Sequence, residues 1–423
     1  MAAIWNVTER TVSAFCKEGK IPGAVKNGKS WQILDDAEKS VDDRISTGRY
    51  RKRDSRTDTK PLPIGISDYV RAQAEYYYVD KTMFIEKIEM QPSYLFLIRP
   101  RRFGKSLTLA MLEAYYDVRY ADQFDELFGN LYIGQHPTPI HNQFLIMRFN
   151  FSEVSSNVNE VEESFRLHCC GKLSDFVYRY EHLLGKDIWN VLDEKTQADP
   201  GAFLSSINTY ATRKGDLKIY LLIDEYDNFT NTILSTYGTD LYRKATHGEG
   251  YIRRFFNVIK AATTGMGSAV NRLFITGVSP VTMDDVTSGF NIGTNITTDP
   301  WFNDLVGFSE KELREMLTYY KEQGALPMSV DDAVTMMKPN YDNYCFSENK
   351  LADCMFNSDM VLYCMKSLIL HGVKPKEIVD PNIRTDFNKL AYLVRLDHGL
   401  GENFSVIKEI AEQGEIVTEI VTH

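Results

Sequence analysis

The sequence predicts an α/β protein with a parallel sheet core, preceded by a small helix-and-hairpin head and followed by a helical region. Three observations predict this architecture. Continuous apolar runs at residues 94–98, 219–223 and 273–280 are typical of strands buried on both faces of a parallel sheet. Helical patterns lie between these runs. Near the N-terminus, two short strand-like runs flank Asn27-Gly28, a pair that favours a tight hairpin turn.

Length and composition are typical of a soluble globular protein. At about 100–200 residues per domain, 423 residues suggest two or three domains. Hydrophobic residues make up 43%, and no stretch approaches the ~18 apolar residues of a membrane span. The N-terminus lacks the regions of a signal peptide, so we expect a cytoplasmic protein with no membrane partner. Six cysteines without a Cys-x-x-Cys pair indicate neither a zinc site nor a disulfide framework.

The formal net charge of −10 is unevenly distributed along the chain. Residues 1–53 contain 11 Lys and Arg against 7 Asp and Glu, whereas the remainder contains 37 against 51. A small basic head therefore precedes a large acidic body. Because the acidity of the body disfavours nucleic acid, we expect any DNA contact to lie within residues 1–53.

A winged helix-turn-helix is predicted for residues 1–50. Thr8 is a good N-cap for an amphipathic helix that ends near Gly19. The hairpin at residues 24–33 would then form the wing.

This segment resembles the DNA-binding heads of MerR-like and excisionase-like proteins. The resemblance implies DNA contacts from the front of the recognition helix and from the wing, which are made by Thr8, Arg10, Thr11, Lys26 and Lys29. The alternative is a small protein-docking module whose charge is incidental.

Residues 23–30 match the phosphate-loop pattern G-x-x-x-x-G-K-[ST], but their context does not fit a nucleotide site. A phosphate loop leaves a buried strand and opens a helix, so that backbone N–H groups converge on the phosphates. Only Ile21-Pro22 precedes this segment, and a strand-like run follows it. We therefore interpret Lys29 as a hairpin residue and not as an ATP ligand.

Residues 51–61 are polar and charged and are predicted to be a linker, after which a core at 62–305 begins. The apolar run at 94–98 leads into a loop that ends with Gly104-Lys105-Ser106, and a helix opens at the Lys-Ser pair. This strand, loop and helix order is the context that a phosphate loop requires. We expect Lys105 to neutralise β/γ-phosphate charge and the Ser106 hydroxyl to bind Mg²⁺.

A second buried run ends in two carboxylates, Asp224 and Glu225. Asp224 is suited to hold Mg²⁺ directly or through water, and Glu225 is suited to polarise an attacking water. The alternative is a solvated strand end. Two acids directly after an apolar strand, in a chain that already has a phosphate loop, favour the metal site.

The third apolar run brings Ser279 to the carboxyl edge of a strand, where ligands bind in open α/β sheets. Ser279, or Thr276 before it, is a candidate sensor of the γ-phosphate or of the attacking water, and the alternative is a turn serine before proline. Arg253 and Arg254 are candidates for an arginine finger, although we favour a solvated helix face for both.

Five motifs in order resemble the bacterial predicted AAA-ATPase family over roughly residues 60–345: residues 62–69, 77–82, 99–106, 224–227 and 276–280. The resemblance implies a P-loop ATPase of the AAA/STAND type that uses ATP and Mg²⁺. It places Lys105 and Ser106 on the nucleotide and assigns Asp224 and Glu225 to metal and water. The residues expected to line the nucleotide site are Arg101, Arg102, Phe103, Gly104, Lys105, Ser106 and Leu107.

The region from 306 to 423 is predicted to be a helical lid followed by a C-terminal tail. Ser309 and Glu312 form a capping-box pattern at the start of the first lid helix. Members of the family often carry a nuclease domain after the lid. We find no pattern of acidic residues and lysine that fits such a nuclease, and we expect that domain to be truncated or lost.

The leading hypothesis is a nucleotide-dependent switch in which Mg²⁺-dependent ATP hydrolysis controls an N-terminal DNA-binding head. A second hypothesis is a DNA-binding regulator that binds nucleotide without turnover, because Arg99 stands where the general phosphate-loop pattern has glycine. A third is the ATPase part of a nuclease-containing defence or mobile-element protein. A homo-oligomer is compatible with each.

Overall fold

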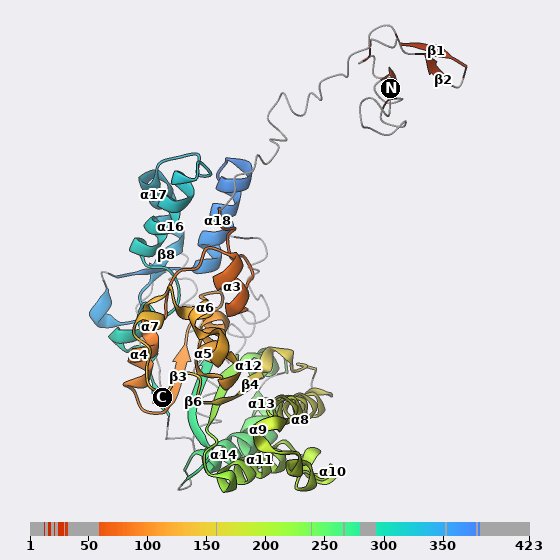
Figure 1. Cartoon of the computed structure of the whole chain (residues 1–423), viewed down its shortest axis with the longest axis vertical. Coiled ribbons are helices and arrows are strands. Elements are labelled where there is room, and N and C mark those ends of the chain that lie inside the picture. The colour runs from red at the N-terminus through yellow and green to blue at the C-terminus, as the bar shows by residue number, and fades with distance from the viewer. Residues whose placement is uncertain are drawn as a thin grey trace, which may run out of the picture. The chain divides into compact units, whose positions relative to one another are not determined.

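The computed structural model describes residues 59–377 except 158, 238, 265–266, 280–292 and 352, together with residue 380. In the head it describes residues 12, 16–17, 21, 24–28 and 30–32. The chain divides into two compact units, Met1–Thr59 and Lys60–His423. Figure 1 shows the elements of each unit.

A five-stranded sheet forms the centre of the second unit, and all of its paired strands are parallel. The strand order is β4-β5-β6-β3-β7. The strands are β3 (Tyr94–Ile98), β4 (Leu145–Asn150), β5 (Ile219–Asp224), β6 (Val270–Gly277) and β7 (Thr294–Asn295). The phosphate-loop strand β3 and the carboxylate strand β5 are therefore both neighbours of β6. Because parallel strands end at one edge, this order brings all three candidate motifs together.

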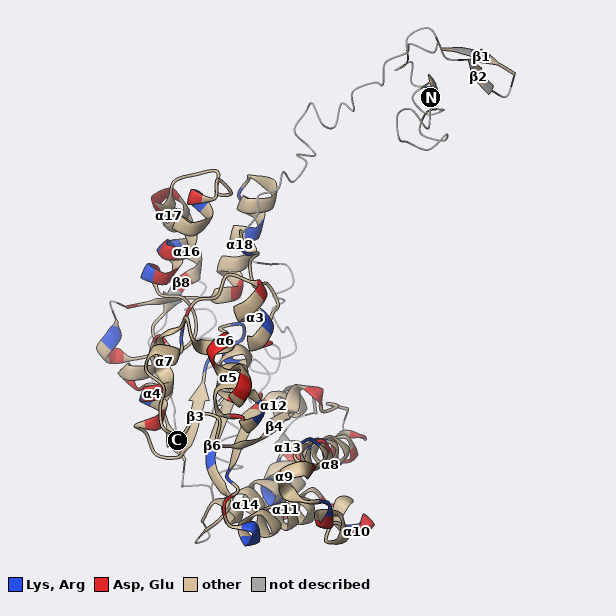
Figure 2. Cartoon of the chain, in the orientation of Figure 1, with Lys and Arg blue, Asp and Glu red and all other residues tan. Residues whose placement is uncertain are grey.

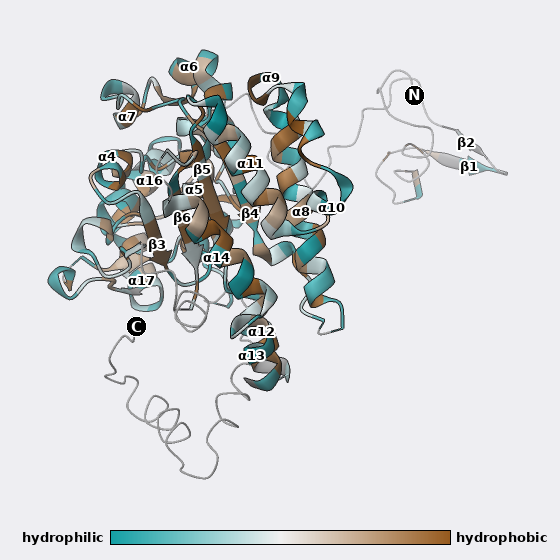
Figure 3. Ribbon diagram, turned by 90° about the horizontal axis from the view of Figure 1, so that it is seen from below, coloured by the Kyte–Doolittle hydropathy of each residue, from teal (hydrophilic) through white to brown (hydrophobic). Residues whose placement is uncertain are grey.

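Alternate residues of each strand face opposite layers, as the pleat of a strand requires. Phe96 and Ile98 belong to one hydrophobic cluster, while Leu95 and Leu97 belong to the other. In Figure 3 the apolar strands lie between helices whose outer faces are hydrophilic. The continuous apolar runs predicted from the sequence thus correspond to strands buried on both faces.

Helices and 3-10 turns cover the two faces of the sheet. The layer that packs with Leu95 and Leu97 contains α3 (Tyr69–Glu75), α4 (Phe84–Glu89), α5 (Lys105–Tyr116), α6 (Phe124–Phe128), α7 (Tyr132–Gln135) and η4 (Pro300–Phe302). The layer that packs with Phe96 and Ile98 contains η2 (Phe151–Glu153), α8 (Val161–Arg179), α9 (Glu181–Leu184), η3 (Lys186–Asn190), α11 (Pro200–Lys214), α12 (Asn228–Tyr237), α13 (Thr239–Thr246) and α14 (Tyr251–Thr264). Two further short elements are η1 (Val118–Gln123) and α10 (Glu194–Gln197).

A third hydrophobic cluster forms the helical region that the sequence predicts as a lid. It contains α16 (Glu310–Glu322), α17 (Val330–Tyr341) and α18 (Ser358–His371), with β8 (Asp342–Tyr344), η5 (Glu348–Lys350) and β9 (Met355–Phe356) between the last two helices. The predicted capping box is present, since Ser309 and Glu312 bond each other's backbone. Charges of both signs alternate over α16 and α17 (Figure 2), and Arg314 bridges Glu310 and Asp331 across them.

In the head, β1 (Val25–Asn27) and β2 (Ser30–Gln32) pair antiparallel, with Asn27 opposite Ser30. Gly28 has a φ of 60°, the positive value that the turn requires. The hairpin prediction is confirmed, and the described residues of the literal phosphate-loop match, 24–28 and 30, belong to this hairpin. Val12 and Cys16 have helical backbone and are buried, in agreement with the predicted apolar face.

Several predicted boundaries agree with the structure, since β3 and α5 occupy the residues expected. The sequence between β4 and β5 also predicts one long helix over 158–183. The structure has α8 followed by the separate turn α9, because Tyr180 leaves helical geometry. The predicted C-terminal tail, residues 405–421, lies outside the described residues. Within the described part of the chain, no helix combines the length and apolarity needed to cross a membrane.

Candidate nucleotide site

The loop at residues 99–104 connects the buried strand β3 to the start of α5 at Lys105. Arg102 and Gly104 have φ values of 69° and 97°, so two residues of the loop have left-handed backbone conformation before the helix begins. Glycine tolerates this conformation at no steric cost, which explains Gly104 at the position before the helix. The strand, loop and helix arrangement predicted from the sequence is confirmed.

Lys105 is buried at the mouth of this loop. Its Nζ donates hydrogen bonds to the carbonyl oxygens of Arg99 at 2.9 Å and Pro100 at 2.8 Å. Burial lowers the pKa of the Lys105 ammonium, and the carboxylates at the end of β5 oppose that shift. Among the described residues, the hydrogen bonds of the Lys105 ammonium go to neutral carbonyl oxygens, and the ammonium can exchange them for the oxygens of a phosphate.

Asp224 is the last residue of β5 and is fully buried. Its Oδ1 accepts a hydrogen bond of 2.7 Å from the Thr276 hydroxyl on β6, while its Oδ2 has no hydrogen-bond partner among the residues that the structure describes. A buried carboxylate oxygen without a partner is costly, and a bound cation would satisfy it. The carboxylate oxygen of Asp224 therefore fits Mg²⁺, which favours oxygen ligands.

Glu225 follows directly and has a φ of 50°, which is uncommon for a residue with a side chain. It is half-buried, and burial together with the neighbouring Asp224 raises the pKa of its carboxyl, while Lys105 and Arg101 oppose the shift. A carboxyl with a raised pKa is better matched to accept a proton near neutral pH than an ordinary glutamate.

Sequence reasoning gave no role of its own to Asp227, which fixes the end of β6. This buried side chain accepts hydrogen bonds from the backbone N–H of Val278 at 3.1 Å and of Ser279 at 2.6 Å. Tyr226 donates its hydroxyl to the Ser279 carbonyl oxygen at 2.6 Å. A Cβ on Gly277 would lie 2.2 Å from Tyr226, so only glycine allows this approach. The position of Ser279 relative to the acids is therefore fixed.

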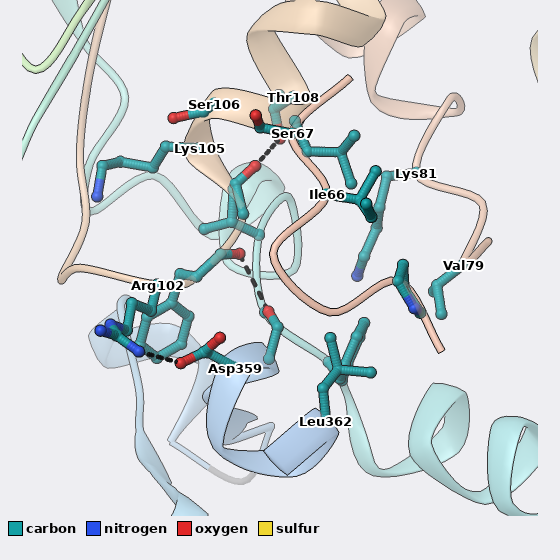
Figure 4. Close-up of a pocket in the computed structure, with 18 of the residues that line it drawn as sticks. Ile66, Ser67, Val79, Lys81, Arg102, Lys105, Ser106, Thr108, Asp359 and Leu362 are labelled. Atoms are coloured by element: carbon teal, nitrogen blue, oxygen red, sulfur yellow. Dashed lines mark hydrogen bonds and ion pairs between the residues drawn. The ribbon is translucent and has the colours of Figure 1, made fainter. Parts of the chain in front are cut away.

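A cavity of about 350 Å³ opens beside the loop and is shown in Figure 4. Lys105, Ser106 and Glu225 line it together. Its other walls come from residues 63–67, 77–81, 305–308 and 358–362. Asp224, Thr276 and Ser279 do not line it. In Figure 4 the loop and the start of α5 stand on one side of the cavity and α18 stands on the other.

A model of the predicted AAA-ATPase family matches residues 63–287, which is more than half of the chain. The chain belongs to this family. One relative, from Azotobacter chroococcum mcd 1, is named "Uncharacterized protein in vnfD 5'region" and is 28% identical over 265 residues. The match covers 60% of this chain and 44% of the relative, so the chain spans less than half of that protein's length.

Membership of the predicted AAA-ATPase family supports nucleotide binding and indicates ATP as the nucleotide. The cavity at the carboxyl edge of the sheet has the form that such binding needs, because the loop, the start of α5 and Glu225 converge on it. The family match ends at residue 287, before α16. The contacts from residues 305–308 and 358–362 are therefore features that the structure adds to the family description.

Arg99 stands at the first position of the loop, where the general pattern has glycine, yet its side chain does not enter the cavity. It is 1% exposed, and its guanidinium donates to the carbonyl oxygens of Ile98, Thr297 and Phe302. It also lies 4.1 Å from the ring centre of Phe346. Burial lowers the pKa of Arg99 to about 9, so the group remains charged at neutral pH. Its role in the structure is to join β3 to the segment before the lid.

The other loop residues divide between the cavity and the lid. Arg101 and Arg102 are exposed at the cavity, whereas the Phe103 side chain is 1% exposed and packs edge-on against Tyr344 and Phe346. The Phe103 carbonyl oxygen accepts hydrogen bonds from Gly307 and Ser358. Leu107 lies in the first turn of α5 and packs partly into the core. Nucleotide contacts from the side chains of Phe103 and Leu107 are therefore limited by this packing.

Other candidate residues lie elsewhere. Arg253 and Arg254 are on α14, and Arg254 lies 3.9 Å from Asp199 at the start of α11, in agreement with a solvated helix face. Lys26 is exposed on β1. Thr8, Arg10, Thr11 and Lys29 lie outside the described residues, so the predicted DNA contacts remain predictions.

Proposed function

We propose that the chain binds ATP in this cavity and hydrolyses it with Mg²⁺, as a switch coupled to a DNA-binding head. The observation that carries the proposal is the buried Oδ2 of Asp224, which has no hydrogen-bond partner in the described part of the chain and lies at the same sheet edge as Lys105 and Glu225. A buried aspartate with a purely structural role would be expected to have hydrogen-bond or ion-pair partners for both of its carboxylate oxygens.

In this proposal each residue has one task. Lys105 binds the β/γ-phosphates, and Ser106 and Asp224 would hold Mg²⁺, which neutralises charge on the phosphate oxygens. Thr276 orients Asp224 through its 2.7 Å hydrogen bond. Glu225 accepts the proton of the attacking water, and Ser279 senses the terminal phosphate. Arg101, Arg102 and Gly104 complete the phosphate loop.

The non-hydrolysing alternative drew its support from Arg99 in the glycine position. That support is weakened, because Arg99 has no positive φ and its side chain points into the protein instead of into the loop. Turnover is therefore the function that the geometry favours.

Phosphate release tests the proposal. We expect Lys105→Ala to abolish nucleotide binding and Glu225→Gln to keep binding while slowing hydrolysis by about 10²–10⁴-fold. Lys311→Ala, at a side chain 86% exposed on α16, and Glu322→Gln, also exposed on α16, are the matched controls and should behave like wild type. Equal turnover in wild type and Glu225→Gln would refute the role of Glu225.

For the head, we propose that Thr8, Arg10, Thr11, Lys26 and Lys29 contact DNA. The exposed Lys26 on an antiparallel hairpin supports a phosphate contact from a wing. Binding of the full chain to random duplex DNA should weaken in Lys26→Ala and Lys29→Ala by a similar factor for all sequences. Retention of full affinity in the double variant would contradict the proposal.

A further inference from the structure

Two neighbouring arginines in the phosphate loop point to different partners. Arg102 pairs with Asp359 at the start of α18, with 2.5 Å between Nη1 and Oδ2 (Figure 4). Arg101 instead donates from Nη2 to Oδ1 of Asn228 at 3.2 Å. The φ of 69° at Arg102 reverses the backbone between the two side chains. One guanidinium is thereby directed to the lid and the other to the carboxylate edge.

The partner of Arg101 places it beside Glu225. Asn228 is the first residue of α12, and its backbone N–H donates to the Glu225 carbonyl oxygen at 3.0 Å. Arg101, Lys105 and Glu225 also line the same cavity. The charge of Arg101 opposes the raised pKa of the Glu225 carboxyl, which is consistent with their proximity.

Arg101 is available for a new partner. Within the described part of the chain, its guanidinium has no carboxylate at ion-pair distance, and its one hydrogen bond goes to a neutral amide. The side chain is exposed. Arginine binds phosphate oxygens with two parallel hydrogen bonds, which are stronger than a bond to an amide. A terminal phosphate near Glu225 would therefore compete well for this group.

We propose that Arg101 contacts the terminal phosphate of ATP during hydrolysis and supplies, from within the same chain, the charge that an arginine finger supplies from a partner. The proposal rests on the ATPase function proposed above. The water oxygen bonds to the γ-phosphorus while the bond from that phosphorus to the β–γ bridging oxygen breaks. The electron pair leaves with ADP, and the water proton moves to Glu225. Arg101 stabilises the negative charge on the γ-phosphate oxygens.

Because the charge comes from the same chain, turnover should not need a second copy. The arginines considered for a finger between subunits, Arg253 and Arg254, lie on α14, and Arg254 already lies near Asp199. We expect the specific activity of the wild type to be independent of protein concentration. A finger from a partner would make activity rise as subunits associate.

The test compares Arg101→Ala and Arg101→Lys with Arg213→Ala. Arg213 is exposed in the last turn of α11, which precedes β5 and so lies at the opposite, amino edge of the sheet. We expect Arg101→Ala to lower single-turnover hydrolysis by at least about 100-fold and to change ADP affinity by less than about threefold. Arg101→Lys should restore part of the rate, and Arg213→Ala should match wild type.

A second measurement separates a catalytic role from a structural one. Aluminium fluoride with ADP and Mg²⁺ mimics the transferred phosphate, so wild type should bind ADP more tightly when fluoride is added, and Arg101→Ala should lose that gain. Wild-type turnover or a full fluoride gain in Arg101→Ala would overturn this inference alone. Absence of ATP turnover in the wild type would overturn the proposed function together with it.

Discussion

Replacing Arg99 by glycine would restore the general phosphate-loop pattern, and we predict that it destabilises the protein. The Arg99 guanidinium donates hydrogen bonds to the carbonyl oxygens of Thr297 and Phe302, which lie about 200 residues further along the chain. With glycine at 99 the Thr297 carbonyl loses this donor, while the Phe302 carbonyl keeps a 3.3 Å bond from the Leu305 N–H, in a place where the Arg99 side chain was only 1% exposed.

The magnitude follows from these contacts. The Thr297 acceptor left without this donor costs about 1–3 kcal/mol, and the lost bond to the Phe302 carbonyl costs about 0.5–1.5 kcal/mol. Loss of the contact with Phe346 costs about 0.5–2 kcal/mol. Glycine adds about 0.5–1 kcal/mol of backbone entropy. Release of the buried charge offsets part of this sum, because a guanidinium without a carboxylate partner is costly to desolvate. We expect a net loss of about 2–4 kcal/mol.

Urea unfolding followed by circular dichroism measures the effect, with Arg254→Ala as the control. Arg254 is 63% exposed and 3.9 Å from its acidic neighbour, so its loss should change the free energy of unfolding by less than about 0.5 kcal/mol. Nucleotide affinity should stay near the wild-type value, because the Arg99 side chain does not line the cavity. An Arg99→Gly variant as stable as wild type, or one with tighter nucleotide binding, would refute this reasoning.

Three further predictions concern the site and the lid. Because the pKa of Glu225 is raised, its carboxyl gains a proton at a higher pH than an ordinary glutamate does. Turnover should therefore fall as the pH drops, and the midpoint of a pH profile of kcat should lie above about 4.3. A lower midpoint would contradict this role of Glu225. Gly277→Ala would place a Cβ 2.2 Å from Tyr226 and should lower the melting temperature by several degrees, whereas unchanged stability in thermal scans would show that the close approach is not required. Asp359→Asn removes the charge that pairs with Arg102, so the backbone amides at the start of α18 should exchange their hydrogens faster. Unchanged amide exchange would show that the ion pair does not stabilise this end of the helix.

Local patterns in the sequence were enough to predict the strand, loop and helix around Gly104-Lys105-Ser106. The apolar run of β3, the Gly104 turn and the start of α5 at Lys105 are determined by neighbouring residues, and the structure confirms each. The same holds for the hairpin at Asn27-Gly28 and for the acids that end β5.

The parts that could not be predicted depend on contacts between distant residues. Nothing near Arg99 in the sequence indicates that its partners are Thr297 and Phe302, so a charged residue in a loop was interpreted as a feature of the loop. In the sequence Asp227 is one more carboxylate after Asp224 and Glu225. Only the strand order, with β6 beside β5, shows that it holds Ser279. The role of a loop residue that contacts another layer can be interpreted only when the fold is known.

The phosphate loop and the lid are joined by hydrogen bonds between two short segments. The carbonyl oxygens of residues 101–103 accept hydrogen bonds from residues 357–359 at the start of α18: Asn357 donates to Arg101, Asp359 to Arg102 and Ser358 to Phe103. A ligand that reshapes the loop must therefore act on α18. Because coupling between two sites acts in both directions, a change that displaces α18 should in turn alter the nucleotide affinity of the loop.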